Sequence, residues 1–388
     1  MPAPALFVID NVRLLEPGVK AVPGSLLIRE GRISRGGPRP TAATPRWNGG
    51  GRLLTPGLTD IHTHGIGRRG YDSGADAIIG GAHDLPRFGV TSFLPTLVPR
   101  PDKACLANLQ EISSAIAKVR GASVPGLHLE GPFMALAGAG CATRPGDLGL
   151  LEELLSAADH RVSAMSISPE TPRIIPVIER LREHGICVFI THTRATVEQT
   201  VAAIDAGATH ATHFYDVFPA LPESDPGVRP AGVVETVLAD PRVTVDFIAD
   251  GVHVHPMAIR AALAAKGFEK VLLITDANIG AGLRPGTYDT PLGYAVRVRE
   301  GDGARHAEKG FLAGSALTMD AGIRNLKKWL KLPEEQVWAM GTANPARLLG
   351  LKNKGHLKAG MDADLVAWDE DGRACRTWVK GECVYERV

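Results

Sequence analysis

The sequence predicts an α/β protein: a (β/α)8 TIM-type barrel with a small β-sandwich domain formed by both chain ends. In the middle of the chain, eight short apolar runs alternate with helix-length amphipathic segments, which is typical of a parallel barrel. A length of 388 residues accommodates one large barrel and one small domain. We therefore assign residues 1–54 and 351–388 to the small domain and 55–350 to the barrel.

The two chain ends show an antiparallel β pattern. Short apolar runs occupy 5–9, 25–28 and 52–54, and turn-forming residues separate them. Residues 363–368 and 377–385 repeat the pattern with glycine turns between them. We expect the two ends to pair into one domain.

The barrel strands are predicted from apolar runs that end in polar residues. The eight runs are 58–62, 92–97, 125–130, 163–167, 186–191, 208–214, 243–249 and 271–275. Amphipathic segments follow most of them, for example 74–89, 172–184, 196–206 and 256–266. The glycine-rich and charged stretch 280–311 predicts an inserted hairpin. Because barrel enzymes carry their chemistry at the carboxyl ends of the strands, functional residues are expected there.

The composition excludes several classes of protein. A formal net charge of +1 gives no electrostatic basis for binding nucleic acid or a membrane surface. The sequence has no apolar run long enough for a membrane span, and its first residues do not form a secretory signal pattern. Its five cysteines are odd in number and include no CxxC pair, which favours a reducing compartment. We expect a cytoplasmic enzyme.

Histidines and carboxylates stand where the predicted strands end. His62 and His64 point to the same side, because strand side chains repeat every two residues. Glu130 directly precedes a Gly-Pro turn, where an unpaired buried charge would be costly. Each such residue alone could be a loop residue or an ion-pair partner, but six together predict a metal site. The six are His62, His64, Glu130, His192, His213 and Asp276.

The ligand types indicate the chemistry of this site. Nitrogen and carboxylate ligands without thiolates suit Zn²⁺, with Fe²⁺, Co²⁺ or Mn²⁺ as alternatives. One ion needs fewer ligands than the six present, whereas two ions bridged by Glu130 would use them all. A metal lowers the pKa of bound water to about 7, so hydroxide becomes available. Asp276 could take the water proton and return it to a leaving amine, which predicts hydrolysis of an amide. His128 and His210 are expected to be packed in the barrel.

Several motifs indicate a family. Residues 54–65 (LTPGLTDIHTHG) and 355–366 flank five further motifs, and all of them follow one another in a fixed order. The five are GLHLEGP (126–132), ATHFY (211–215), IADGVHV (248–254), ITDA (274–277) and LAGSALTM (312–319). With them the chain resembles the N-acetylglucosamine-6-phosphate deacetylases of the amidohydrolase superfamily.

The resemblance implies roles for the candidate residues. Glu130, His192 and His213 would hold the main catalytic metal, and the pair of histidines at 62 and 64 a second one. Asp276 would be the catalytic acid and base. It also implies a small amino-sugar substrate and a homodimer. The substrate-binding candidates are His253, Asp216, Cys141, Ala142, Arg229 and Leu312.

The chain departs from the family where the substrate binds. The family's Gly-x-His, whose histidine touches the acyl carbonyl, is Gly140-Cys141-Ala142 here. The family asparagine after the sixth strand is Asp216, and its arginine-containing turn reads Ser-Asp-Pro-Gly at 224–227. We therefore expect weak discrimination for a 6-phosphate. The alternative is that Arg229, or the pair Arg68 and Arg69, binds the phosphate.

Three functions remain open from the sequence. The first is removal of an acyl group from an N-acylated amino sugar by metal-bound hydroxide. The second is hydrolysis of a different amide, such as an N-acyl amino acid or a cyclic amide, or action on an unphosphorylated sugar. The third is a catalytically inactive scaffold, which the six retained strand-end residues argue against.

Overall fold

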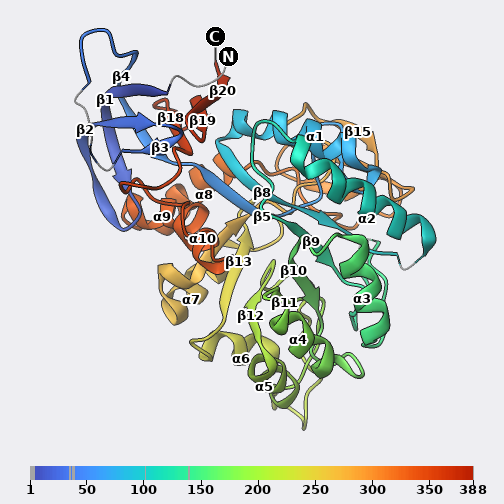
Figure 1. The fold of residues 1–388 in the computed structure, drawn as a ribbon. Coiled ribbons are helices and arrows are strands. Elements are labelled where there is room, and N and C mark those ends of the chain that lie inside the picture. Colours follow the sequence, from blue (N-terminus) through green and yellow to red (C-terminus); the bar gives the residue numbers. More distant parts are fainter. Residues whose placement is uncertain (1–4, 35, 37–39, 101, 139, 388) are drawn as a thin grey trace.

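The centre of the protein is a closed barrel of eight parallel strands (Figure 1). The computed structural model describes residues 5–34, 36, 40–100, 102–138 and 140–387, so the outermost residues of both predicted terminal segments lie outside it. Each barrel strand overlaps one of the eight predicted runs. They are β5 (Leu58–Thr63), β8 (Val90–Leu97), β9 (Leu127–Glu130), β10 (Val162–Ile167), β11 (Cys187–Ile190), β12 (Ala208–Ala211), β13 (Thr244–Ile248) and β14 (Val271–Ile274).

The barrel closes between its first and last strands, β5 and β14. Asp276 N donates a hydrogen bond of 2.8 Å to His62 O, and His64 N donates one of 2.8 Å to Ala277 O. Just below them, Thr275 Oγ1 donates to Asp60 Oδ2 at 2.6 Å. These bonds cross from one edge of the sheet to the other, so the predicted (β/α)8 barrel is confirmed.

Helices surround the barrel and mostly follow the predicted segments. One predicted helix, 74–89, is shorter than expected: α1 ends at Asp84 and a 3-10 turn over Leu85–Phe88 follows. Pro86 explains the break, because it lacks the N–H that a continuing α-helix needs. No helix in the described part of the chain is both long and apolar enough to cross a membrane. The α-helices are α1 (Ala75–Asp84), α2 (Lys103–Ala115), α3 (Leu148–Ala157), α4 (Ile174–Glu183), α5 (Val197–Ala206), α6 (Val233–Ala239), α7 (Pro256–Lys266), α8 (Met319–Leu330), α9 (Glu334–Gly341) and α10 (Ala343–Leu348).

The barrel strands alternate between two hydrophobic clusters. Phe93 packs in the large cluster shared with the helices, whereas the next residue, Leu94, belongs to a separate one. Phe189 of that second cluster lies against the rings of His128 and His210, at centroid distances of 5.1 and 4.5 Å. One face of each strand is therefore directed into the barrel, so polar residues on that face can meet at its mouth.

The two chain ends form one seven-stranded sheet beside the barrel (blue and red in Figure 1). The domain boundaries remain a prediction; β4 continues two residues past residue 54. The strand order is β20-β19-β18-β4-β1-β2-β3. The strands are β1 (Leu6–Glu16), β2 (Val19–Arg29), β3 (Arg32–Ile33), β4 (Arg46–Pro56), β18 (Leu365–Trp368), β19 (Ala374–Val379) and β20 (Glu382–Glu386).

This sheet curls around a hydrophobic core of its own. The core includes Ile28 of β2, near one edge of the sheet, and Trp378 of β19, near the opposite edge. At Gly31, in the turn between β2 and β3, an added Cβ would lie only 2.6 Å from the backbone oxygen of Lys380 in the turn before β20. The turns can approach this closely because glycine has no Cβ. The strands enclose a core as a sandwich does, although they are hydrogen-bonded in a single sheet.

The predicted inserted hairpin is present and has a third strand. The antiparallel sheet contains β15 (Gly286–Asp289), β16 (Ala295–Arg299) and β17 (Gly303–His306). A two-stranded ribbon, β6 (Gly65–Ile66) and β7 (Arg69–Gly70), follows β5. The insertion lies between the last barrel strand and α8, so its loops reach the carboxyl ends of the strands.

Candidate metal centre

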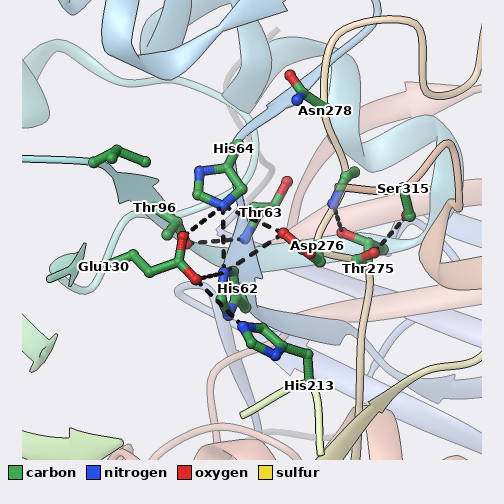
Figure 2. Close-up of polar contacts among 12 residues, drawn as sticks. His62, Thr63, His64, Thr96, Glu130, His213, Thr275, Asp276, Asn278 and Ser315 are labelled. Carbon is green, nitrogen blue, oxygen red and sulfur yellow. Dashed lines mark hydrogen bonds and ion pairs between the residues drawn. The ribbon is translucent and has the colours of Figure 1, made fainter. Parts of the chain in front are cut away.

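Glu130, at the end of β9, lies among histidines from other strands (Figure 2). Its Oε1 is 3.3 Å from His213 Nε2 and 3.4 Å from His192 Nε2. Its Oε2 is 3.2 Å from His64 Nε2. Glu130, His192 and His213 are buried, and the side chain of His64 is 14% exposed. The carboxylate is thus at the centre of the group of strand-end residues.

Asp276 faces the same group from the side opposite Glu130 (Figure 2). Its Oδ1 is 3.2 Å from His64 Nε2 and 3.5 Å from His62 Nε2. The same Oδ1 is buried and has no partner with hydrogen-bond geometry among the described residues. The structure therefore brings all six strand-end residues together.

Hydrogen bonds on the far side of two rings set which nitrogen carries the proton. Thr212 Oγ1 donates to Asp246 at 3.0 Å, so it accepts the hydrogen bond of 2.9 Å from His62 Nδ1. His213 Nδ1 donates to the backbone oxygen of Asp216 at 3.2 Å. With Nδ1 as the donor in both rings, the Nε2 atoms of His62 and His213 face Glu130 Oε1 at 3.6 and 3.3 Å and are available to a cation.

Lone pairs directed at a carboxylate are repulsive unless a cation or added protons lie between them. In addition, the two Nε2 atoms of His62 and His64 are only 3.4 Å apart. Among the described residues, two groups of ligand atoms are close enough to hold an ion, and both include Glu130. The first group consists of Glu130, His62 and His64. The second consists of Glu130, Cys141 and His192. These donors can bind a divalent cation.

The protein without a cation compensates by protonation. Burial raises the pKa of Glu130, but hydrogen bonds from His192 and His213 and the nearby histidines outweigh it, so the net pKa lies well below its usual range. Burial lowers the pKa of His213, yet its hydrogen bond to Glu130 and the charge of that carboxylate raise it to about 10. Burial holds the pKa of His62 well below its ordinary value. His62 is thus a ring with a lowered pKa beside His64 and His213, whose pKa values are raised, against the effect of burial, by the carboxylates of Glu130 and Asp276.

Three of the six residues have left-handed backbone conformations. The φ angles are 46° at His192, 36° at His213 and 47° at Asp276. Non-glycine residues pay roughly 1–2 kcal/mol for this conformation. Each of them stands two residues past the end of a barrel strand, where the chain turns away from the sheet. This turn directs the side chains over the barrel mouth.

A layer of buried polar residues supports the group from below. His128 Nδ1 is 3.1 Å from Thr96 Oγ1 and its Nε2 is 2.7 Å from Ser166 Oγ. Burial lowers the pKa of His128 to about 3, so this ring is neutral. His210 donates to Asp246 from Nε2 at 2.7 Å. Both rings are fully buried and hydrogen-bonded within the barrel.

The loop after β9 covers the group. At Gly138 an added Cβ would lie 2.1 Å from His192 Cε1, so the loop backbone contacts the ring directly. Cys141 Sγ is 3.6 Å from Glu130 Oε2. The cavity beside them measures about 110 Å³, compared with roughly 300–1,000 Å³ for typical ligand pockets. In this conformation the loop leaves little room above the candidate metal centre.

The substrate-binding candidates are distributed unevenly around this cavity. Asp216, Cys141, His253 and Leu312 line it, together with five of the six strand-end residues. His253 Nδ1 donates to Asp250 Oδ2 at 2.8 Å. The other two candidates are not among the lining residues. Ala142 lies next to Cys141 in the loop, and the exposed Arg229 forms an ion pair of 2.7 Å with Glu235.

A sequence model of the amidohydrolase family matches residues 53–384. The chain belongs to the amidohydrolase family. The match spans the barrel and most of the returning C-terminal strands. The resemblance predicted from the sequence motifs is thereby confirmed at the level of the superfamily.

Individual relatives confirm the closer resemblance. The chain is 36% identical to an N-acetylglucosamine-6-phosphate deacetylase of Vibrio furnissii, covering 86% of this chain and 83% of the relative. It is 33% identical to an N-acetylgalactosamine-6-phosphate deacetylase of Escherichia coli O157:H7, with coverage of 92% and 93%. One similar solved structure is the N-acetyl-D-glucosamine-6-phosphate deacetylase of Mycobacterium smegmatis, a mutant in complex with N-acetyl-D-glucosamine-6-phosphate. The two chains superpose with a TM-score of 0.85 at 31% identity, and the match covers 98% of this chain and 100% of the other. The chain is an amide hydrolase similar to these deacetylases.

Proposed function

We propose that the chain removes the acyl group of N-acylated amino sugars with the help of a divalent cation. The observation that carries the proposal is the group around Glu130, in which the Nε2 atoms of four histidines converge on one buried carboxylate; they belong to His62, His64, His192 and His213. A cation between them resolves this arrangement. Relatives named for deacetylation of N-acetylated amino sugar phosphates support the substrate class.

The six strand-end residues divide into two ligand sets in this proposal. Glu130, His192 and His213 hold the main catalytic cation. His62 and His64, which form a ligand group with Glu130, would hold a second cation. Zn²⁺ is the first candidate, because imidazole and carboxylate ligands suit it, with Fe²⁺, Co²⁺ and Mn²⁺ as alternatives.

Asp276 is the proposed catalytic acid and base. A divalent cation at this site polarises an amide carbonyl and lowers the pKa of water. Asp276 Oδ1 is buried without a hydrogen-bond partner and faces the same histidines, so it can accept the proton of the attacking water. As the carbon–nitrogen bond breaks, Asp276 returns that proton to the leaving amine, and the products are a carboxylate and an amino sugar.

A 6-phosphate contributes little to binding in this proposal. Of the described residues that line the cavity, none is lysine or arginine, whereas Asp72 and Asp216 are acidic. Phosphate dianions are usually held by arginine, lysine or backbone N–H groups. Arg229 is engaged by Glu235, and Arg69 by Asp84. The preferred substrate is therefore an N-acylated amino sugar whose recognition does not depend on phosphate.

The test compares kcat/KM for N-acetylglucosamine and for its 6-phosphate with the metal-loaded enzyme. We expect the two values to agree within about tenfold, which corresponds to about 1.4 kcal/mol. An Arg229→Ala variant should leave the ratio unchanged. A preference of a hundredfold or more for the phosphorylated sugar, abolished by Arg229→Ala, would establish phosphate recognition instead.

The resemblance to the deacetylases also implies a homodimer, which we include in the proposal. Light scattering on the purified protein measures this directly. A mass near 41 kDa, the mass of one chain, would contradict it.

A further inference from the structure

We propose that Cys141 is a ligand of the main catalytic cation, so that the resting site contains a thiolate. This inference rests on the proposed function, because it assigns one more residue to the same metal site. Cys141 stands in the loop segment where the family has a histidine one position later, and it was predicted here only as a substrate contact. The structure places its sulfur within the metal centre.

The geometry of the second ligand group carries this proposal. Cys141 Sγ, a carboxylate oxygen of Glu130 and a ring nitrogen of His192 all lie within 4.8 Å of one another. Cys141 Sγ is 3.6 Å from Glu130 Oε2, on the carboxylate that both ligand groups share. The separations are those of side chains that can turn toward a common ion.

The loop itself is held against the site by independent contacts. Leu136 N donates a hydrogen bond of 3.2 Å to the backbone oxygen of His192. The backbone at Gly138 lies so close to the His192 ring that a residue with a side chain would not fit at this position. These contacts hold the loop segment before Cys141 against the His192 ring. They also account for the small cavity, which has to enlarge before an amino sugar can enter.

Thiolate binding completes a four-ligand set. Cys141 would join Glu130 and His192, which lie in the same ligand group, and His213 as a fourth ligand, the number that structural zinc sites use. The thiol loses its proton to solvent as it binds. Catalytic zinc sites usually keep one position open for water or substrate, so this loop has to withdraw Cys141 when substrate binds. A thiolate also narrows the choice of metal, favouring Zn²⁺ and Co²⁺ over the oxygen-preferring Mn²⁺.

Cobalt spectroscopy tests this assignment without measuring activity. The protein is stripped with a chelator and reloaded with Co²⁺, and the absorption spectrum is recorded for the wild type, Cys141→Ser and Cys375→Ser. Cys375 is the matched control, because it lies in β19 and belongs to neither ligand group. We expect a thiolate-to-cobalt charge-transfer band in the near ultraviolet for the wild type and the control, and its loss in Cys141→Ser.

The spectra separate this proposal from the proposed function. Visible cobalt bands without the charge-transfer band in the wild type would retain the metal site and reject Cys141 as a ligand. A protein that binds no Co²⁺ at all would reject the metal site itself. A charge-transfer band that persists in Cys141→Ser would also overturn the assignment.

Alkylation of the wild type provides a second test that needs no variant. Iodoacetamide modification of each cysteine is followed by mass spectrometry with and without Zn²⁺. We expect Zn²⁺ to slow modification of Cys141 at least tenfold and to leave the rate at Cys375 unchanged. Equal rates at Cys141 under both conditions would contradict the proposal even if Cys141→Ser failed to fold.

Discussion

Asp246 in β13 is predicted to control metal affinity. It is not itself a proposed metal ligand, and it does not contact the ring of one. Its carboxylate accepts hydrogen bonds from His210 Nε2 at 2.7 Å, Thr212 Oγ1 at 3.0 Å and the backbone N–H of His213 at 2.5 Å. Two of these donors belong to the site. His213 is a proposed ligand, and Thr212 sets which ring nitrogen of His62 carries the proton. Asp246 is therefore a positioning residue.

The substitution Asp246→Asn keeps the shape and replaces one acceptor oxygen by an N–H₂ group. The backbone N–H of His213 cannot reverse its direction, so at least one donor then faces another donor or loses its acceptor. Hydrogen bonds to charged groups are worth about 1.5–3 kcal/mol. One such loss corresponds to roughly a 10- to 100-fold weaker metal affinity, the range found for residues that orient metal ligands.

The assay titrates the metal-free protein with Zn²⁺ against a competing chelator. Asp205→Asn is the matched control, because Asp205 is exposed and pairs only with Arg242 on the surface. We expect Asp246→Asn to bind Zn²⁺ at least tenfold more weakly and the control to match the wild type. If Asp246→Asn were less stable to urea but bound Zn²⁺ with an affinity within about threefold of the wild type, Asp246 would be merely structural and the reasoning refuted.

The remaining predictions concern the chemistry and the stability of the chain. Asp276→Asn should lower turnover by about 10²- to 10⁴-fold, because it removes the proton acceptor, while elemental analysis should find the metal retained; near-normal turnover would assign the proton to another residue. Elemental analysis of the metal-replete wild type should give two equivalents, falling to one in the His62→Ala, His64→Ala double variant; a value of one in both would remove the second site. Burial raises the pKa of Glu16, but hydrogen bonds from His356 Nδ1 and a backbone N–H outweigh it and leave the folded pKa below 4.5. Glu16→Gln should therefore cost about 1–3 kcal/mol in urea unfolding near neutral pH, and the deficit should shrink as the pH falls below 4.5; a deficit independent of pH would exclude the charge as its cause.

The positions of the site residues followed from the sequence because strand ends meet at one mouth of a barrel. His62, Glu130 and Asp276 each interrupt or end an apolar run, and the register of parallel strands brings such positions together. The barrel itself was predictable because its strands are short, largely apolar runs; β8, for example, is buried along its whole length.

Other features depend on long-range contacts that leave only a weak pattern in the sequence. Asp246 is visible as a carboxylate inside the run Val245–Phe247, but its partners come from a different strand, β12, and from the residues after it. The approach of Cys141 to Glu130 depends on how one loop folds over the barrel mouth. The curl of the terminal sheet likewise arises from contacts between turns at Gly31 and Lys380, which lie far apart in the chain.

The seam between β5 and β14 joins residues from nearly opposite ends of the barrel sequence. Thr275 and Asp60, which bond across it, are 215 positions apart. Joining segments so far apart in the chain is entropically costly. His62 and His64 belong to one side of the seam and Asp276 to the other. A chain in which β5 and β14 have not joined holds His62 and His64 apart from Asp276, so we expect hydrolytic competence to require a complete ring of strands. Substitutions that weaken the contacts between β5 and β14 should therefore abolish activity under conditions in which the rest of the protein is still folded.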